Sequence, residues 1–206
     1  MRTLTAQPPF AGSQAPRPGE GLEIHRLTPD RTADFLRFFD NEAFRDHPEW
    51  GFCYCQCFLE DHAKINWPER TGAENRALAC RRIETGTMRG FLAYCGGDVV
   101  GWCNAAPRRL FHALDDEPSP SDEATGTILC FLVVPAQRGA GIARALLGAA
   151  CDGLRADGLT LVEANPRPEA KGDAANHFGP MSLYTGAGFT VRRKDSDGSV
   201  WVHKRL

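Results

Sequence analysis

The chain has 206 residues, of which 42% are hydrophobic and 24% are charged. Both shares are near the averages for globular domains, so disordered and fibrous classes are excluded. The 24 Lys and Arg residues nearly balance 26 Asp and Glu residues, and the formal net charge of −2 argues against nucleic-acid binding. No run reaches the roughly 18 apolar residues of a membrane helix, and there is no apolar leader. We therefore expect one cytoplasmic domain without membrane contact.

The chain contains eight scattered cysteines. Because we see no secretory signal, we expect all of these thiols to be reduced. Cys130 lies in the run ILCFLVV and Cys151 lies in LLGAACDGL, where a thiol packs like a small hydrophobic side chain. These two thiols are therefore expected in the core.

The first residues differ in composition from the rest of the chain. Residues 1–21 carry four prolines and few aliphatic side chains, so they lack the apolar surface needed to offset the entropy of ordering. We expect a flexible arm there and a folded domain over residues 22–206.

The first half of this domain is predicted to contain a strand and two helices. Alternation of apolar and polar residues indicates the strand, and the spacing of Phe35, Leu36 and Phe39 indicates the first helix, after an N-cap-like start at Thr28. The expected elements are a strand at 21–28, a helix at 32–44, an irregular stretch at 45–68 and a helix at 75–85.

The second half is predicted to contain an antiparallel hairpin, a β-α-β unit and a final hairpin. Gly96 and Gly97 separate the strands of the first hairpin, and Pro135 ends a continuous apolar strand. The expected elements are strands at 90–95 and 99–107, a buried strand at 128–134, a helix from Ile142 to Leu154, a strand at 159–164, a short helix at 182–186 and a hairpin across 195–198.

Chemistry is indicated most clearly where the buried strand meets the helix. Arg138, Gly139 and Gly141 follow Pro135, so backbone N–H groups and one fixed positive charge gather at the start of a helix. This arrangement suits a pyrophosphate. Alternatively, the glycines only allow close helix packing. A dinucleotide fold, with Glu163 on the ribose, is disfavoured because Arg144 stands where the third glycine would be.

The order of these elements, with VVPAQRGAGIA followed by LYTGAGF, resembles the Gcn5-related N-acetyltransferases over residues 22–206. The resemblance implies a single α/β domain with a mixed central sheet, flanked by helices, whose central parallel strands splay apart. It also implies acetyl-CoA as co-substrate between the strands at 127–134 and 159–164. The implied cofactor-binding residues are Phe131, Leu132, Val133, Arg138, Gly139, Ala140, Gly141, Ile142 and Ala143.

Direct acetyl transfer to an amine requires a base, an oxyanion donor and an acid for the thiolate. By resemblance, Tyr184 is the acid, and Glu163 at a strand end is the candidate base, although it could equally form a salt bridge. His112 and His177 are reserve bases. The backbone N–H of Leu132 or Val133 would stabilise the oxyanion, and Cys130 keeps an acetyl-cysteine route open.

Two features bear on the acceptor. Cys53, Cys55 and Cys57 lack the spacing of a zinc site, so we expect no metal. Five aromatic residues either line an acceptor pocket or belong to the core, namely Trp50, Phe52, Tyr54, Trp67 and Trp102. Arg108 is a candidate for holding an acidic substrate.

The expected function is an N-acetyltransferase acting on a small-molecule or peptide amine, with a homodimer left open. The alternative is a non-catalytic acyl-CoA-binding or metal-sensing module on the same fold.

Overall fold

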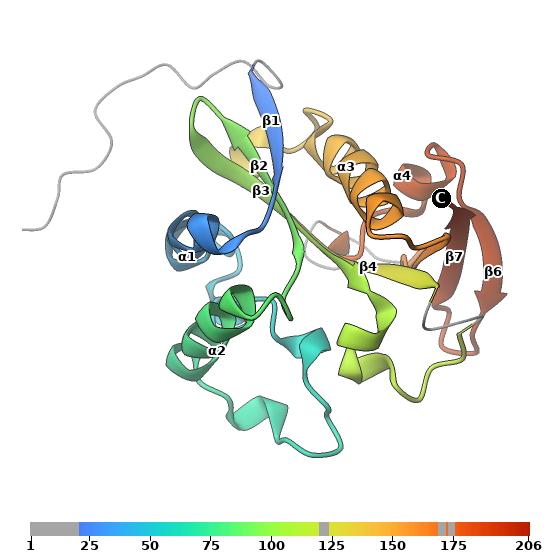
Figure 1. The fold of residues 1–206 in the computed structure, drawn as a ribbon, viewed down its shortest axis with the longest axis horizontal. Coiled ribbons are helices and arrows are strands. Elements are labelled where there is room, and N and C mark those ends of the chain that lie inside the picture. Colours follow the sequence, from blue (N-terminus) through green and yellow to red (C-terminus); the bar gives the residue numbers. More distant parts are fainter. Residues whose placement is uncertain (1–20, 120–123, 169–171, 173–175) are drawn as a thin grey trace, which may run out of the picture.

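A computed structural model describes residues 21–119, 124–168, 172 and 176–206. Its centre is one seven-stranded sheet with the order β1-β2-β3-β4-β5-β7-β6, shown in Figure 1. The strands are β1 (Leu22–Arg26), β2 (Gly90–Cys95), β3 (Asp98–Pro107), β4 (Thr125–Val133), β5 (Leu161–Ala164), β6 (Thr190–Lys194) and β7 (Val200–Arg205). Only the β4–β5 pair is parallel among these strands. The predicted mixed α/β fold is confirmed; the arm predicted at 1–21 lies outside the described residues, except for Gly21.

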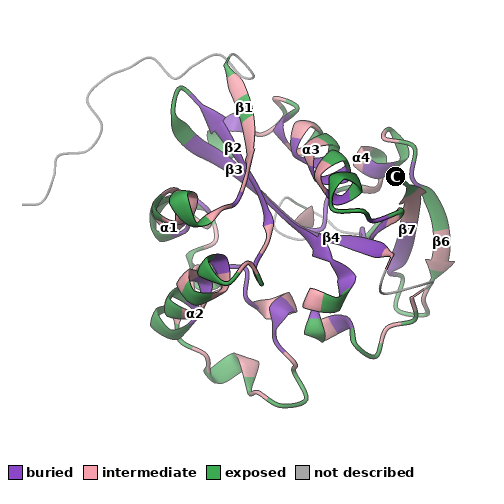
Figure 2. Ribbon diagram, in the orientation of Figure 1, coloured by how far each residue is buried: buried purple, intermediate pink, exposed green. Residues whose placement is uncertain are grey.

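Helices cover both faces of the sheet. They are α1 (Thr32–Asn41), α2 (Gly72–Glu84), α3 (Ile142–Ala156) and the short α4 (Met181–Thr185). Figure 1 shows α1 and α2 on one side of the β1–β3 strands and α3 on the other. Each face therefore has its own hydrophobic cluster, and the strands between them are largely buried, as Figure 2 shows.

Local sequence signals explain most element boundaries. The β2–β3 turn places Gly96 and Gly97 at φ 60° and 88°, a backbone region that favours glycine. Helix α2 begins at Gly72, earlier than predicted, because Thr71 and Glu74 form a reciprocal capping box. That pair satisfies backbone N–H groups that the helix itself leaves without partners.

The sheet opens along β4. Strand β5 pairs only with the first part of β4, from Thr125 to Ile128. The remainder of β4 continues to Val133, so its edge from Leu129 onward has no β5 partner. The predicted splay between the central parallel strands is therefore confirmed.

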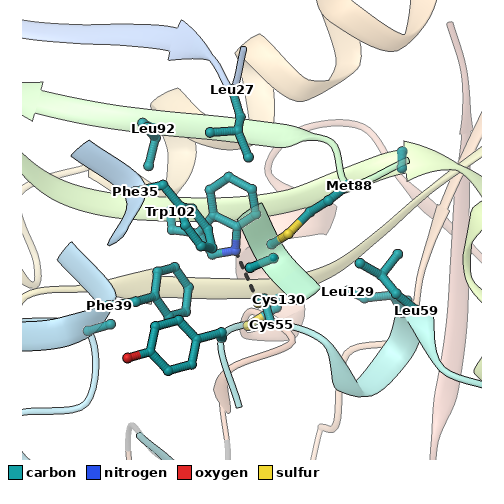
Figure 3. Close-up of a cluster of buried hydrophobic side chains, with 14 of the residues drawn as sticks. Leu27, Phe35, Phe39, Cys55, Leu59, Met88, Leu92, Trp102, Leu129 and Cys130 are labelled. Carbon is teal, nitrogen blue, oxygen red and sulfur yellow. Dashed lines mark hydrogen bonds between the residues drawn. The ribbon is translucent and has the colours of Figure 1, made fainter. Parts of the chain in front are cut away.

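The core beneath α1 is built around Trp102. Phe35 lies edge-on to the indole ring with centroids 5.2 Å apart, and the indole Nε1–H donates to Cys55 Sγ at 3.1 Å (Figure 3). Trp102 and Tyr54 are both buried in this cluster. Of the five aromatic residues considered for an acceptor pocket, these two therefore belong to the core.

The cysteines are as expected. All eight are free thiols, and Cys130 and Cys151 are buried. Across the part of the chain that the structure describes, no helix has the length and apolar character to span a membrane.

Candidate active site

A cleft of about 570 Å³ lies where the sheet opens. All the predicted cofactor-binding residues except Ala140 line it. The irregular segment after α1 contributes Phe44, Asp46 and Trp50 to the lining, and the segment before α4 contributes His177 and Gly179. The structure thus brings three segments of the chain together at the end of β4, at residues 43–50, 131–144 and 176–183.

The loop before α3 has the shape of an anion cradle. Gly139 and Gly141 have φ of 79° and 82°, and a Cβ built on either would meet no atom within 4 Å. Gly141 precedes the first turn of α3, which has no side-chain cap. The first N–H groups of a helix lack intrahelical partners and carry partial positive charge. This open, uncapped turn fits the pyrophosphate of a CoA molecule.

Arg138 is already held in place at this cradle. Its Nε–H donates to the Val133 carbonyl at 3.1 Å, and its Nη1–H donates to Asp46 Oδ2 at 2.6 Å. The hydrogen bond from Arg138 lowers the pKa of Asp46, so this carboxyl is ionised near neutral pH. An incoming phosphate would therefore compete with Asp46 for the guanidinium.

The backbone of β4 presents alternate residues to the gap. Val134 N–H donates to Val100 of β3 at 3.0 Å, which directs the backbone groups of Leu132 toward β3 as well. Phe131 and Val133 consequently direct theirs toward the gap. Phe131 N–H donates to the His177 carbonyl at 2.6 Å. Of the two candidate oxyanion donors, only Val133 therefore directs its N–H toward the cleft.

Tyr184 lies behind the wall of the cleft. Its side chain is fully buried, and its hydroxyl donates to the Phe178 carbonyl at 2.5 Å. Burial raises the pKa of Tyr184 well above its usual value, so the phenol keeps its proton. A Cβ on Gly179, which lines the cleft, would lie 3.3 Å from the hydroxyl oxygen. The acid role of Tyr184 stays a prediction that requires the 176–179 segment to shift.

Glu163 is paired with an arginine, and it does not line the cleft. Its carboxylate accepts from Arg108 Nη1 at 2.5 Å and lies 3.6 Å from Arg192. Burial raises the pKa of Glu163 and the two arginines oppose that shift. This geometry is that of a structural ion pair, and the base role of Glu163 stays a prediction that the geometry does not favour. Arg108, considered above for binding an acidic substrate, is 3% exposed and serves this pair instead.

Glu163→Gln is expected to lower the free energy of unfolding by about 3–5 kcal/mol, because it leaves Arg108 buried beside a neutral side chain. Urea denaturation measures this loss. Glu42→Gln is the matched control, since Glu42 pairs with exposed Arg45 and such pairs contribute about 0–1 kcal/mol. A Glu163→Gln protein as stable as this control would show that the pair is not structural.

A second, smaller cavity of about 200 Å³ adjoins the cleft. The two cavities share Phe44, Trp50, Leu132 and His177. The remaining lining consists of the aromatic residues Phe52, Phe58 and Trp67 and the thiols of Cys53, Cys55, Cys57 and Cys130. Three of the five predicted aromatic residues thus do line a pocket. We name this second cavity the side cavity.

Among the described residues, no group of three or more His, Cys, Asp or Glu side chains is arranged to hold a metal.

The histidines differ in their position relative to these cavities. His177 lines both, with its ring 4.2 Å from that of Phe178. His47 lines only the cleft, pairs with Glu49 at 3.1 Å and stacks on Trp50. His112 lines neither and lies 3.4 Å from Asp115.

The segment after α1 lines part of the cleft, which its sequence did not predict. Asp46 contacts Arg138 across 92 positions of chain, and Phe44 lines both cavities. The segment has no regular periodicity, so nothing in its pattern indicated which strand or helix it would meet. Only the aromatic content around Trp50 hinted at a binding surface.

A family model described as the acetyltransferase (GNAT) family matches residues 35–178. The chain belongs to this family, which confirms the resemblance drawn from its sequence.

Individual relatives agree with this assignment. A mycothiol acetyltransferase of Frankia alni is 29% identical over 205 residues, covering 94% of the chain but 49% of that protein, so the chain spans about half the length of this relative. The GNAT domain of PAT from S. lividans is 20% identical with a TM-score of 0.57, covering 89% of each chain. The acetyltransferase yncA of Salmonella typhimurium, solved with acetyl-CoA, is 17% identical with a TM-score of 0.54, covering 90% of this chain and 94% of that one. These two structures have the same fold.

Proposed function

We propose that this protein transfers the acetyl group of acetyl-CoA to a primary amine of a small molecule or peptide, by direct attack in a ternary complex. The observation that carries the proposal is the cleft at the open edge of β4, with the glycines of the 138–143 loop facing empty space. Acetyl-CoA supplies the activated acetyl group. The new N–C bond replaces the C–S bond, the amine loses a proton and the departing thiolate gains one.

Three groups of the chain would hold the co-substrate. The N–H groups at the first turn of α3 bind the pyrophosphate, and Arg138 exchanges Asp46 for a phosphate oxygen. Phe131 N–H and the Val133 carbonyl pair with the amide groups of the pantetheine arm, which leaves Val133 N–H for the oxyanion. For this pairing, the His177 carbonyl must leave Phe131 N–H.

The displacement of His177 also bears on the acid. His177 and Phe178 are neighbours, and their carbonyls occupy Phe131 N–H and the Tyr184 hydroxyl respectively. A shift of this short segment would therefore release both donors together. Tyr184 would then be free to protonate the leaving thiolate, and the oxyanion would accept a hydrogen bond from Val133 N–H.

His177 is the best-placed base. It is the histidine that lines both the cleft and the side cavity, so an amine entering between them would meet its ring. A neutral imidazole takes up a proton near neutral pH, which suits the removal of a proton from the attacking amine.

His177→Gln is expected to lower kcat/KM by a factor of about 10²–10⁴ and to flatten the rise of kcat/KM with pH that an unprotonated base produces. CoA release measured over a panel of amines between pH 5 and 9 tests both effects. His112→Gln is the control, because His112 lies outside both cavities. An unchanged pH profile in His177→Gln would reject this base.

An acetyl-cysteine route through Cys130 and a non-catalytic acyl-CoA-binding module remain the rival readings. The name of the Frankia relative does not identify the acceptor of this chain, because that protein is about twice as long and only 29% identical. The domain boundary at residue 22 and a homodimer stay predictions.

A further inference from the structure

The side cavity is electrically neutral. Apart from His177 at its junction with the cleft, its described lining consists of aromatic, aliphatic and thiol groups. Burial raises the pKa of Cys53 and of Cys57 to about 12, and it raises the pKa of Cys55 as well. These thiols are therefore uncharged near neutral pH.

Residues 46–50 carry two carboxylates, and neither lines the side cavity. Glu49 lies 3.1 Å from the His47 ring, and Asp46, which would leave Arg138 when a phosphate binds, lines only the cleft. A second positive charge carried by an acceptor would therefore enter this space without a counter-charge from the described residues.

The cavity is continuous with the place where acetyl transfer would occur. Leu132 on β4 and His177, the proposed base, line both spaces. Its volume of about 200 Å³ exceeds that of an apolar cavity of about 150 Å³ known to bind benzene. A phenyl ring or a chain of six carbons therefore fits.

The apolar lining also favours the reactive form of the amine. Removing an ammonium from water without a counter-charge disfavours its charged form and lowers the pKa of the amine. An amine drawn in by its apolar body would lose its proton more readily to His177. The same desolvation penalty disfavours a body that ends in a second ammonium, which must stay charged without a partner or lose its own proton at a further cost.

We propose that the side cavity is the acceptor-specificity pocket and that it selects primary monoamines with an uncharged apolar body, against diamines and polyamines. This inference rests on the proposed acetyltransferase function and adds the substrate class.

Hexylamine and 1,6-diaminohexane provide the test, because they share a six-carbon chain and differ only by a second ammonium group on its far end. With acetyl-CoA and the wild-type protein, kcat/KM from CoA release is expected to be at least about 100-fold higher for hexylamine, since the diamine must either bury an unpaired ammonium or first lose a second proton. Equal or better turnover of the diamine would overturn the inference while leaving acetyl transfer intact.

A charge placed in the cavity should change this preference. Cys57→Asp is expected to shift the hexylamine-to-diamine ratio by at least about tenfold toward the diamine, because the carboxylate pairs with the second ammonium. The matched control is Cys80→Asp, which alters a half-buried thiol on α2 outside the cavity and should keep the wild-type ratio. An unchanged ratio in folded Cys57→Asp would contradict the pocket.

A binding measurement separates failure of the pocket from failure of the proposed function. Trp50 and Trp67 line the cavity, so hexylamine added to the CoA complex should change tryptophan fluorescence, and the diamine should not. If neither amine is acetylated but this difference persists, the enzyme assignment fails and the pocket stands. Equal fluorescence responses to both amines would overturn the assignment of the side cavity to the acceptor. The same holds if the protein prefers hexanoyl-CoA to acetyl-CoA without discriminating between the amines, because the cavity would then hold the acyl chain.

Discussion

Tyr184→Phe is expected to lower kcat by a factor of about 10²–10⁴, the usual contribution of one positioned acid. The substitution keeps the buried ring and its edge-on contact with Phe189, whose centroid is 5.2 Å away, so packing is preserved. The lost hydrogen bond leaves the Phe178 carbonyl without this donor, which should destabilise the fold by about 1–3 kcal/mol. CoA affinity should not fall, because the hydroxyl does not line the cleft and its hydrogen bond to Phe178 must already break when CoA binds.

Stopped-time assays of CoA release, together with CoA titration of the same variant, separate the chemical step from binding. Cys130→Ala is the companion variant, and it should retain turnover because direct attack by the amine needs no thiol. Full turnover by Tyr184→Phe together with an inactive Cys130→Ala would reject the ternary-complex mechanism in favour of the acetyl-cysteine route.

The fold was predictable wherever short-range signals determine it. Alternation and the Gly96-Gly97 turn predicted the β2–β3 hairpin, and an apolar strand followed by a periodic helix predicted the β4-α3-β5 unit. Helix α2 begins three residues before the predicted start at residue 75, because the Thr71–Glu74 capping box fixes its first turn. This boundary depends on local hydrogen bonding alone, so the sequence does encode it.

The site was predictable in part. The glycine loop could be found because glycines at a strand-to-helix turn have a direct physical meaning. The ion pair of Glu163 could not be predicted, since the position of Glu163 at a strand end does not show whether an arginine 55 residues away reaches it. The contact between Asp46 and Arg138 could not be predicted either, because both contacts depend on long-range packing of irregular segments.

Gly141→Val is expected to weaken CoA binding by at least about 100-fold. The added side chain would enter the open space at the first turn of α3, where the pyrophosphate accepts hydrogen bonds, and each lost bond to a charged group is worth about 1.5–3 kcal/mol. Valine also strains a backbone with φ of 82°.

A control variant must separate the effect of backbone strain on CoA binding from the effect of blocking the pyrophosphate site. Gly158, just beyond the other end of α3, has φ of 84° and also open space around its Cβ. Gly158→Val therefore imposes a similar backbone strain without touching the cleft. It should lose stability as Gly141→Val does, yet bind CoA like the wild type.

Calorimetric titration of CoA into the wild type, Gly141→Val and Gly158→Val shows whether the cleft between β4 and α3 holds acetyl-CoA. We expect one-to-one binding by the wild type and by Gly158→Val, and binding at least about 100-fold weaker by folded Gly141→Val. Equal CoA affinity in all three proteins would contradict this assignment.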